Sequence, residues 1–219
     1  MVLAVLALAG CGSGKDELRV SAASSLQKAF TAYDARPRYS FAGSDQLAAQ
    51  IRAGARPDVY AAANTELPES LYRAGLVQRP VPFARNRLVL ATGSARVRSL
   101  ADAARRGVTV AIGSPTVPVG VYARRGLAGV PLGRRILANV RSQEPDVAGI
   151  VGKLEQGAVD AGFVYATDAR AAGLRAIPLP RSDVEYAIAI VRKSAAAQRF
   201  VRGLLSGAGR RALLAAGFK

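Results

Sequence analysis

Residues 18–33 read LRVSAASSLQKAFTAY, and this stretch joins a strand pattern directly to a helix pattern. Its first five residues, 18–22, predict a strand. Four apolar side chains then recur at helical spacing: Leu26, Ala29, Phe30 and Tyr33. A strand that runs straight into a helix is the repeating unit of α/β proteins, so this stretch predicts that fold class.

The same alternation of strand and helix continues along nearly the whole chain. Further strands are predicted at residues 58–62, 87–91, 108–112, 161–165 and 185–191, and helices are predicted between most of them. We therefore expect an α/β protein with mainly parallel sheets. The predicted strands at 87–91 and 185–191 lie where one alternating pattern gives way to another. We expect both to cross between two lobes that have a cleft between them.

Composition excludes several kinds of chemistry. The chain has 219 residues, half of them apolar, which is enough for a real core. It contains no histidine and one cysteine, Cys11. Ser-His-Asp and Cys-His catalysis, zinc, haem or iron–sulfur sites ligated by His or Cys, and internal disulfides are therefore excluded within this chain. An enzyme would have to use carboxylates, Ser, Tyr, Lys, Arg or an oxygen-liganded metal.

The charge is strongly basic, because 31 Lys and Arg residues face 15 Asp and Glu residues and give a net charge of +16. Such an excess raises the possibility of nucleic acid or acidic membrane partners. The arginines, however, are scattered from Arg19 to Arg211, and the seven Tyr and six Phe residues are spread thinly. We therefore expect a solvated basic surface and no nucleic-acid partner.

The N-terminal segment is typical of an exported protein. Residues 2–10 are apolar and are followed by Cys11 and a polar run. Nine apolar residues are too few to span a bilayer but suit a signal peptide, and residues 8–11 resemble the bacterial lipobox. Residues 1–10 are thus predicted to be a signal peptide and residues 11–17 a tether lipidated at Cys11. The alternative is a short buried helix with an incidental thiol.

Four short segments carry a small or hydroxyl residue where a strand ends and a helix begins: residues 22–26, 41–44, 113–120 and 144–147. The N–H groups at a helix start are unpaired and carry partial positive charge, so several helix starts in one cleft make an anion site. Ser25 and Ser44 would add hydroxyl donors. Each segment alone is more often a simple helix cap, and Ser44 can cap the helix that follows it.

With these motifs the sequence resembles the molybdate-binding proteins of molybdate ABC importers, which are type II periplasmic binding proteins. The resemblance runs from about residue 18 to residue 218. Its markers are AASSL at 22–26, FAGS at 41–44, QIRAGA at 50–55, PDVY at 57–60, GSP at 113–115, VPVGVYA at 117–123, Asp146-Val147, AGFVY at 161–165, Asp168-Ala169, YAIA at 186–189 and Gly217-Phe218. The resemblance implies a two-lobed fold in which each lobe is a mainly parallel sheet flanked by helices. Lobe 1 would comprise residues 18–88 and 187–219, and lobe 2 residues 89–186.

The resemblance also implies a set of ligand-binding groups. The oxyanion would be held by the hydroxyls of Ser25, Ser44 and Tyr165 and by the backbone N–H groups of Val119 and Val147. Molybdate, tungstate and sulfate are fully deprotonated dianions that only accept hydrogen bonds, whereas phosphate carries a proton and wants an acceptor. The implied protein is an extracytoplasmic monomer that binds without catalysing and needs no cofactor. Its partners would be a membrane permease with a separate ATPase.

Departures from the family pattern leave alternatives open. The stretch between Ser25 and Ser44 is several residues shorter than usual, which must trim the first helix or the second strand, and Asn64 replaces a common acidic residue. Asp45 stands where a neutral residue is usual; it is either an acid favoured in the first turn of a helix or a group that faces the anion and favours phosphate. The rival ligands are sulfate, phosphate and small organic anions. The rival functions are an enzyme that uses Asp and Tyr and a basic surface lipoprotein that binds polyanions.

Overall fold

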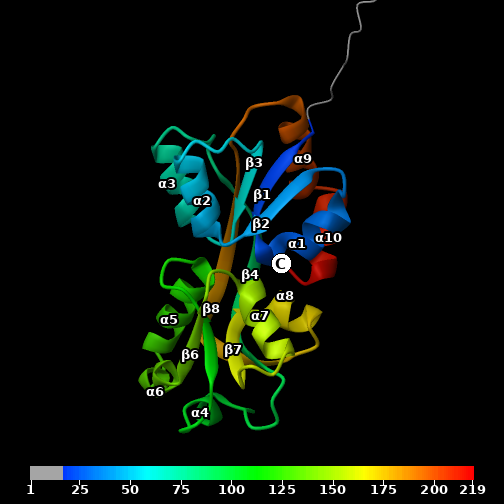
Figure 1. Ribbon diagram of the computed structural model, residues 1–219. Helices are drawn as coiled ribbons and strands as arrows, with labels where there is room; N and C mark the ends of the chain where they lie inside the picture. Colours follow the sequence, from blue (N-terminus) through cyan, green and yellow to red (C-terminus); the bar gives the residue numbers. More distant parts are fainter. Residues whose placement is uncertain (1–16) are drawn as a thin grey trace, which may run out of the picture.

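The computed structural model describes residues 17–219, which form one eight-stranded sheet with helices packed on it (Figure 1). The strand order is β2-β1-β3-β8-β4-β7-β5-β6. The strands are β1 (Arg19–Ala23), β2 (Arg38–Ala42), β3 (Val59–Ala62), β4 (Val81–Thr92), β5 (Val110–Gly113), β6 (Val140–Glu144), β7 (Ala161–Tyr165) and β8 (Arg175–Ile190). The helices are η1 (Ser24–Leu26), α1 (Gln27–Tyr33), α2 (Ser44–Arg52), α3 (Glu66–Arg73), α4 (Leu100–Ala103), α5 (Pro118–Ala128), α6 (Gly133–Ala138), α7 (Val147–Glu155), α8 (Ala166–Ala171), α9 (Ala195–Leu205) and α10 (Ala208–Ala216).

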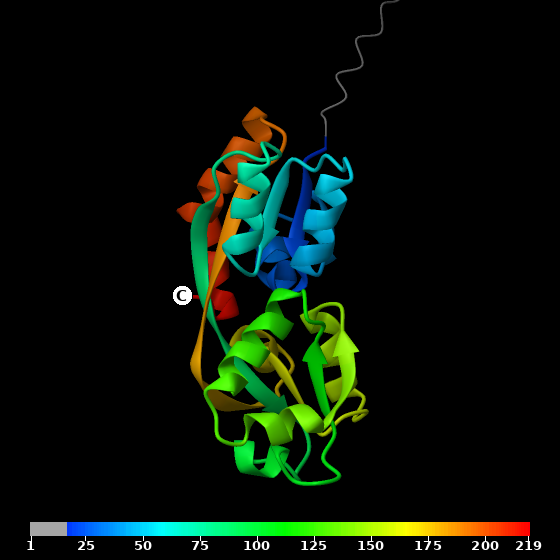
Figure 2. The same ribbon diagram turned by 90° about the vertical axis from the view of Figure 1, so that its left-hand side faces the viewer.

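These elements gather into two lobes, one above the other in Figures 1 and 2. The first lobe contains β1, β2 and β3 with helices α1, α2, α3, α9 and α10. The second lobe contains β5, β6 and β7 with helices α4 to α8. Strands β4 and β8 run along both lobes and are the only long elements that do so among residues 17–219. The predicted two-lobed α/β fold is therefore confirmed, while the exact lobe boundaries stay a prediction.

In each lobe three strands pair in parallel, and one of the two long strands pairs antiparallel at their edge. β1 pairs in parallel with β2 and β3, and β5 pairs in parallel with β6 and β7. β8 joins the first lobe antiparallel to β3, and β4 joins the second lobe antiparallel to β7. Strands β3, β5 and β7 are buried throughout because helices cover both of their faces. Because no face of these strands meets solvent, their sequences are short apolar runs without alternating polar residues.

The two long strands extend well beyond the predicted ranges 87–91 and 185–191. β4 has 12 residues and β8 has 16, and the two pair antiparallel along most of their length. The register between them shifts between Arg87 and Val89, and Arg181 on the same ribbon has a positive φ of 50°. The ribbon therefore carries an irregularity between the lobes, which is the natural place for a bend.

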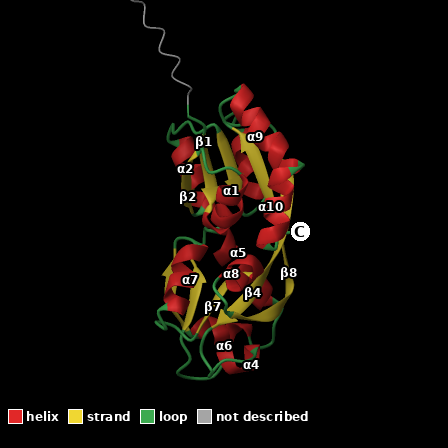
Figure 3. Cartoon of the chain, turned by 90° about the vertical axis from the view of Figure 1, so that its right-hand side faces the viewer, coloured by secondary structure: helices red, strands yellow, loops and turns green. Residues whose placement is uncertain are grey.

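Apolar side chains fill both lobes. Helix α2 buries Leu47, Ala48 and Ile51 against Tyr60 of β3. Helix α10 packs against α1 and α9 on the other side of the sheet (Figure 3). No helix among residues 17–219 has the length and apolar character needed to cross a membrane. The predicted signal peptide, nearly all of the tether and Cys11 lie outside the described residues.

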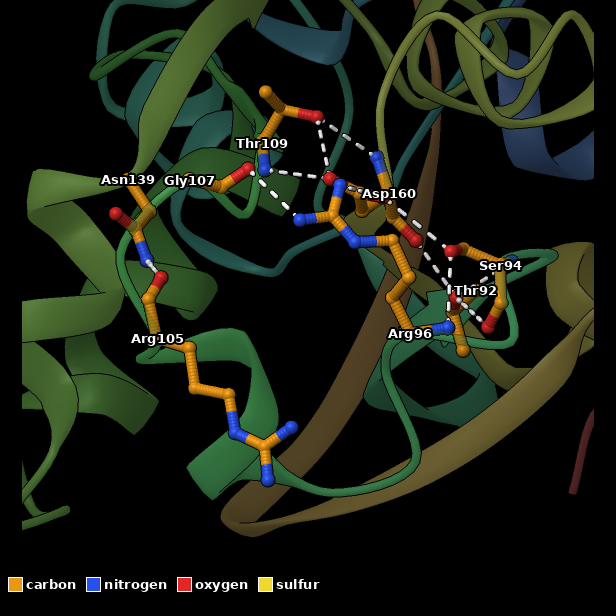
Figure 4. A network of polar contacts seen from close by, with 8 residues as sticks. All are labelled: Thr92, Ser94, Arg96, Arg105, Gly107, Thr109, Asn139 and Asp160. Carbon is orange, nitrogen blue, oxygen red and sulfur yellow. Dashed lines mark hydrogen bonds and ion pairs between the residues drawn. The ribbon is translucent and has the colours of Figure 1, made fainter.

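A polar network at the far end of the second lobe ties β4 to β5 (Figure 4). Asp160 accepts hydrogen bonds from the backbone N–H of Thr109 at 2.9 Å and from its hydroxyl at 3.0 Å. The Thr92 hydroxyl donates to the carbonyl of Asp160 at 2.7 Å. Burial raises the pKa of Asp160, but the bonds from Thr109 and the charge of Arg96 outweigh it and hold this pKa below its usual value. The network stabilises the end of the lobe and lies away from the interface between the lobes.

Candidate functional site

A small cavity lies between the two lobes. Its lining comes from four helix starts, the end of β7 and the residue after β3, and consists of Ala23, Ser24, Ser25, Ala42, Gly43, Ser44, Ala63, Val117, Pro118, Val119, Asp146, Val147 and Tyr165. All five residues predicted for ligand binding are among them. The structure therefore brings together groups that are up to 140 positions apart in the sequence, from Ser25 to Tyr165.

The first lobe contributes two buried serines. Ser25 lies in η1, directly after β1, and its hydroxyl is 3.0 Å from the hydroxyl of Tyr186. Ser44 is the first residue of α2, and its hydroxyl accepts a hydrogen bond from the N–H of Ala63 at 3.0 Å. A serine hydroxyl has one hydrogen and two acceptor positions, so this bond leaves the hydrogen of Ser44 for another partner.

The prediction that Ser44 caps its helix is wrong. The cap position belongs to Gly43, and no side chain bonds the first turn of α2. Ser44 is instead held by β3, because its carbonyl also accepts a hydrogen bond from the hydroxyl of Tyr60 at 2.7 Å. The side chain of Ser44 thus makes a tertiary contact and does not cap its own helix.

The second lobe contributes two helix starts. Pro118 occupies the first position of α5 and has no N–H, so the first free donor of that helix is the N–H of Val119. Val147 is the first residue of α7, and the Asp146 carboxylate before it caps the helix by accepting from the N–H of Gly149 at 3.0 Å. Both helix starts therefore present unpaired N–H groups where they line the cavity.

Glycine allows α5 to start directly against the end of β5. A Cβ atom built on Gly120 would lie 2.0 Å from the carbonyl oxygen of Ser114 and 2.4 Å from that of Gly113. Both contacts are far shorter than any real Cβ contact, and both are to rigid backbone. The spacing of Gly113 and Gly120 in the sequence therefore has a packing reason, which is the close approach of strand end and helix start.

Tyr165 stands at the end of β7 with its side chain fully buried, and its ring packs edge-on against the ring of Tyr186, 5.7 Å away. Burial is the largest cause that raises the pKa of both tyrosine hydroxyls well above 10; nearby Tyr186 adds to the rise for Tyr165, and nearby Asp168 adds to it for Tyr186. Both therefore stay protonated at neutral pH and remain able to donate a hydrogen bond. Tyr186 is the group that sequence reasoning missed; the motif at 186–189 contains it, but only the structure shows that it holds Ser25.

Asp45 does not line the cavity. Its Oδ2 atom accepts a hydrogen bond of 2.6 Å from the hydroxyl of Thr116, which belongs to the other lobe. The carboxylate lies in the first turn of α2, where the helix dipole favours negative charge. Of the two readings of Asp45, the structure thus shows the first-turn acid, with a partner that the sequence did not predict.

A model of the bacterial extracellular solute-binding proteins matches residues 18–219. The chain belongs to this family. Among its relatives, the molybdate-binding protein ModA of Mycobacterium bovis is 34% identical over 96% of this chain and 87% of its own length. The molybdate-binding protein ModA of Haemophilus influenzae is 26% identical over 82% of this chain and 77% of its own length.

Solved structures of solute-binding proteins share the fold. The periplasmic molybdate-binding protein of Azotobacter vinelandii superposes with a TM-score of 0.80 at 21% identity, covering 93% of this chain and 99% of that one. The sulfate-binding protein SubI of Mycobacterium tuberculosis superposes with a TM-score of 0.79 at 16% identity, covering 92% and 86%. This solute-binding protein therefore shares its two-lobed fold with one protein named for molybdate and another named for sulfate.

The cavity is lined by neutral hydrogen-bond donors and not by cationic side chains. No lysine or arginine is among the residues of the described chain that line it, although the whole protein carries a net charge of +16. Asp146 is the one ionisable acid in the lining, and its carboxylate is turned to the start of α7. Hydroxyl and backbone N–H donors therefore dominate the site of this solute-binding protein.

Proposed function

We propose that the protein binds molybdate, and tungstate with it, as the solute-binding component of an ABC importer. The observation that carries this proposal is the cavity between the lobes, where the hydroxyls of Ser25, Ser44 and Tyr165 meet the starts of α5 and α7. The names of the relatives, which include molybdate-binding proteins at 34% identity, supply the ligand.

The donor set suits a dianion without protons. Such an anion accepts hydrogen bonds at every oxygen and has none to donate, so a lining of neutral donors can satisfy it. Several oriented dipoles offset the loss of hydration without the desolvation cost of a buried arginine. Phosphate, which keeps a proton at neutral pH, would need an acceptor, and the carboxylate of Asp146, the one in the described lining, already accepts from the N–H of Gly149.

Binding would be coupled to closure of the two lobes. Ser25 and Ser44 belong to the first lobe, while Val119, Val147 and Tyr165 belong to the second, so an anion between them joins both. The closed form would present one continuous surface to a membrane permease whose separate ATPase supplies the energy. The protein itself would act as a monomer, perform no catalysis and need no cofactor.

Thermal unfolding of the purified protein tests the ligand. The protein is heated with and without molybdate, tungstate, sulfate and phosphate at equal ionic strength. A ligand at a hundred times its dissociation constant adds about 2.7 kcal/mol, which is about 5 to 10 °C for a chain of this size. A shift with molybdate and tungstate alone supports the proposal. A shift with sulfate or phosphate alone reassigns the ligand, and no shift with any anion overturns it.

We also propose that a lipid on Cys11 anchors the protein to the outer face of the cytoplasmic membrane. The support is the apolar run at residues 2–10 and the lipobox-like residues 8–11. A Cys11→Ser variant should move from the membrane fraction of expressing cells to the soluble or secreted fraction. Unchanged membrane association would contradict the anchor.

A further inference from the structure

The start of α2 touches the second lobe directly, at the edge of the cavity. A Cβ atom on Gly43 would lie 2.4 Å from the carbonyl oxygen of Pro145 and 3.3 Å from Cγ2 of Val117. Pro145 precedes α7 and Val117 precedes α5, so both belong to the opposite lobe. The two lobes are thus in direct van der Waals contact at this point, and any opening must separate these atoms.

One hydrogen bond crosses this contact. The hydroxyl of Thr116 donates to Oδ2 of Asp45 at 2.6 Å, a short distance typical of a bond to a charged acceptor. The other carboxylate oxygen, Oδ1, is buried and has no hydrogen-bond partner. When the lobes separate, Oδ2 loses Thr116 and both oxygens become free to bind water.

We propose that Asp45 and Thr116 form a latch that holds the lobes closed over the bound anion, an inference that rests on the proposed function. Neither side chain lines the cavity, so the latch acts on the equilibrium between open and closed forms and not on the ligand itself. The apparent dissociation constant equals the intrinsic constant divided by the closed fraction. Loss of the latch therefore lowers the affinity for every anion by the same factor, mainly because the anion is released faster.

The first test uses Thr116→Val, which removes the hydroxyl but keeps the shape of the side chain. We expect molybdate to bind about 3- to 10-fold more weakly and to dissociate faster by a similar factor, which is the fold-change that corresponds to the net contribution of a typical hydrogen bond. Thr116→Ser keeps the hydroxyl and should bind like the original protein. Glu69→Ala, which breaks the exposed pair with Arg73 within the first lobe, is the matched surface control.

The second test is a double-mutant cycle. Asp45→Ala removes the acceptor together with a negative charge near the anion, so its effect alone mixes two causes. In the Asp45→Ala background, Thr116→Val should have no further effect on affinity or release rate. The ratio of the affinities for molybdate and sulfate should stay unchanged in Thr116→Val, because the latch does not touch the ligand.

The outcomes are distinct. Equal binding and release by the original protein and Thr116→Val overturn the latch, as does an equal effect of Thr116→Val with and without Asp45. A change in the ratio between two anions would make Thr116 a ligand contact instead. If the original protein binds none of the four anions, the proposed function fails and the latch fails with it.

Discussion

At the residue scale, the site depends on side chains whose hydrogens are kept free by their neighbours. Ser44 shows this clearly, because the N–H of Ala63 occupies one of its acceptor positions and the bond between Tyr60 and its carbonyl fixes its backbone. The sequence predicted that Ser44 belongs to the site but also predicted a capping role. A local pattern cannot show that β3, which follows in the chain, supplies the partner.

Ser44→Ala should weaken molybdate binding by about 1.5 to 3 kcal/mol, the range for a hydrogen bond to a charged group. Titration calorimetry of the purified variant gives this value directly. Ser99→Ala removes a cap from α4, far along the second lobe, and should lower stability while leaving affinity unchanged. Unchanged affinity of Ser44→Ala would exclude its hydroxyl from the binding site.

Asp168 makes stability depend on pH. Burial raises its pKa to about 8, nearby Asp146 adds to this, and backbone hydrogen bonds oppose it only in part. Its Oδ2 atom is buried without a partner. In the unfolded chain the pKa is about 3.9, so between about pH 4 and 8 the folded protein keeps a proton that the unfolded chain releases. The free energy of unfolding should therefore fall as pH rises through this window and level off above it.

Asp168→Asn should remove this contribution, which has a slope of at most about 1.4 kcal/mol per pH unit. Urea unfolding at several values between pH 5 and 8.5 measures it, and the absence of histidine leaves that window nearly free of other side-chain titrations. Asp102→Asn is the control, because the pKa of half-buried Asp102 is lowered by its bonds to Arg98 and Ser99. Parallel curves for the original protein and Asp168→Asn would contradict the prediction.

At the scale of elements, strands buried on both faces were predicted well, and strands with one face exposed to solvent were predicted poorly. β7 was predicted at residues 161–165 and has those bounds, because all five of its residues are buried. The first ten residues of β8 were missed, since they include two prolines and several exposed polar side chains on the ribbon beside β4. α6 was missed, and β6 was given no bounds although a strand was expected to end at residue 144, because Arg, Ser, Gln and Glu cover the outer faces of these elements.

The junction of β5 and α5 should tolerate no side chain at Gly120. Gly120→Ala places a methyl group against the backbone of Ser114 and Gly113, and overpacking of this kind costs about 1 to 3 kcal/mol. Gly126→Ala on the same helix is the matched control, because its Cβ would meet nothing nearer than 3.8 Å. It should be neutral or stabilising by up to about 1 kcal/mol. Thermal unfolding of both variants checks the pair, and equal stabilities would contradict it.

At the scale of the whole molecule, the net charge of +16 and a cavity lined by neutral donors predict different responses of the proposed binding to salt. An anion held by buried dipoles should lose little affinity as salt rises, because buried interactions are screened weakly. Raising sodium chloride from about 0.05 to 0.5 M should therefore change the dissociation constant for molybdate by less than about 10-fold. Calorimetric titrations across this range measure it. A steep dependence, as for polyanions bound to a basic surface, would instead favour surface binding.

The two-lobed arrangement was predictable from the sequence, but the contact between the lobes was not. Alternating strands and helices predicted the α/β class, and the motifs named the five residues that meet in the cavity. The hydrogen bond between Asp45 and Thr116 joins residues 71 positions apart on different lobes. No periodicity or local motif encodes such a pair, because it depends on the angle that the β4–β8 ribbon sets between the lobes.

The path of the chain through β4 and β8 also sets an order in time for biosynthesis. The first lobe needs β8 beside β3 and α10 beside α1, and the backbone of Lys219 pairs with that of Arg85 at 2.8 and 2.9 Å. The helices of the second lobe, in contrast, all come from one uninterrupted stretch. As the nascent chain emerges, the first-made third of the molecule must therefore wait unfinished for the last-made segment. An export pathway that carries unfolded chains would therefore act on this protein before its first strands had paired with β8.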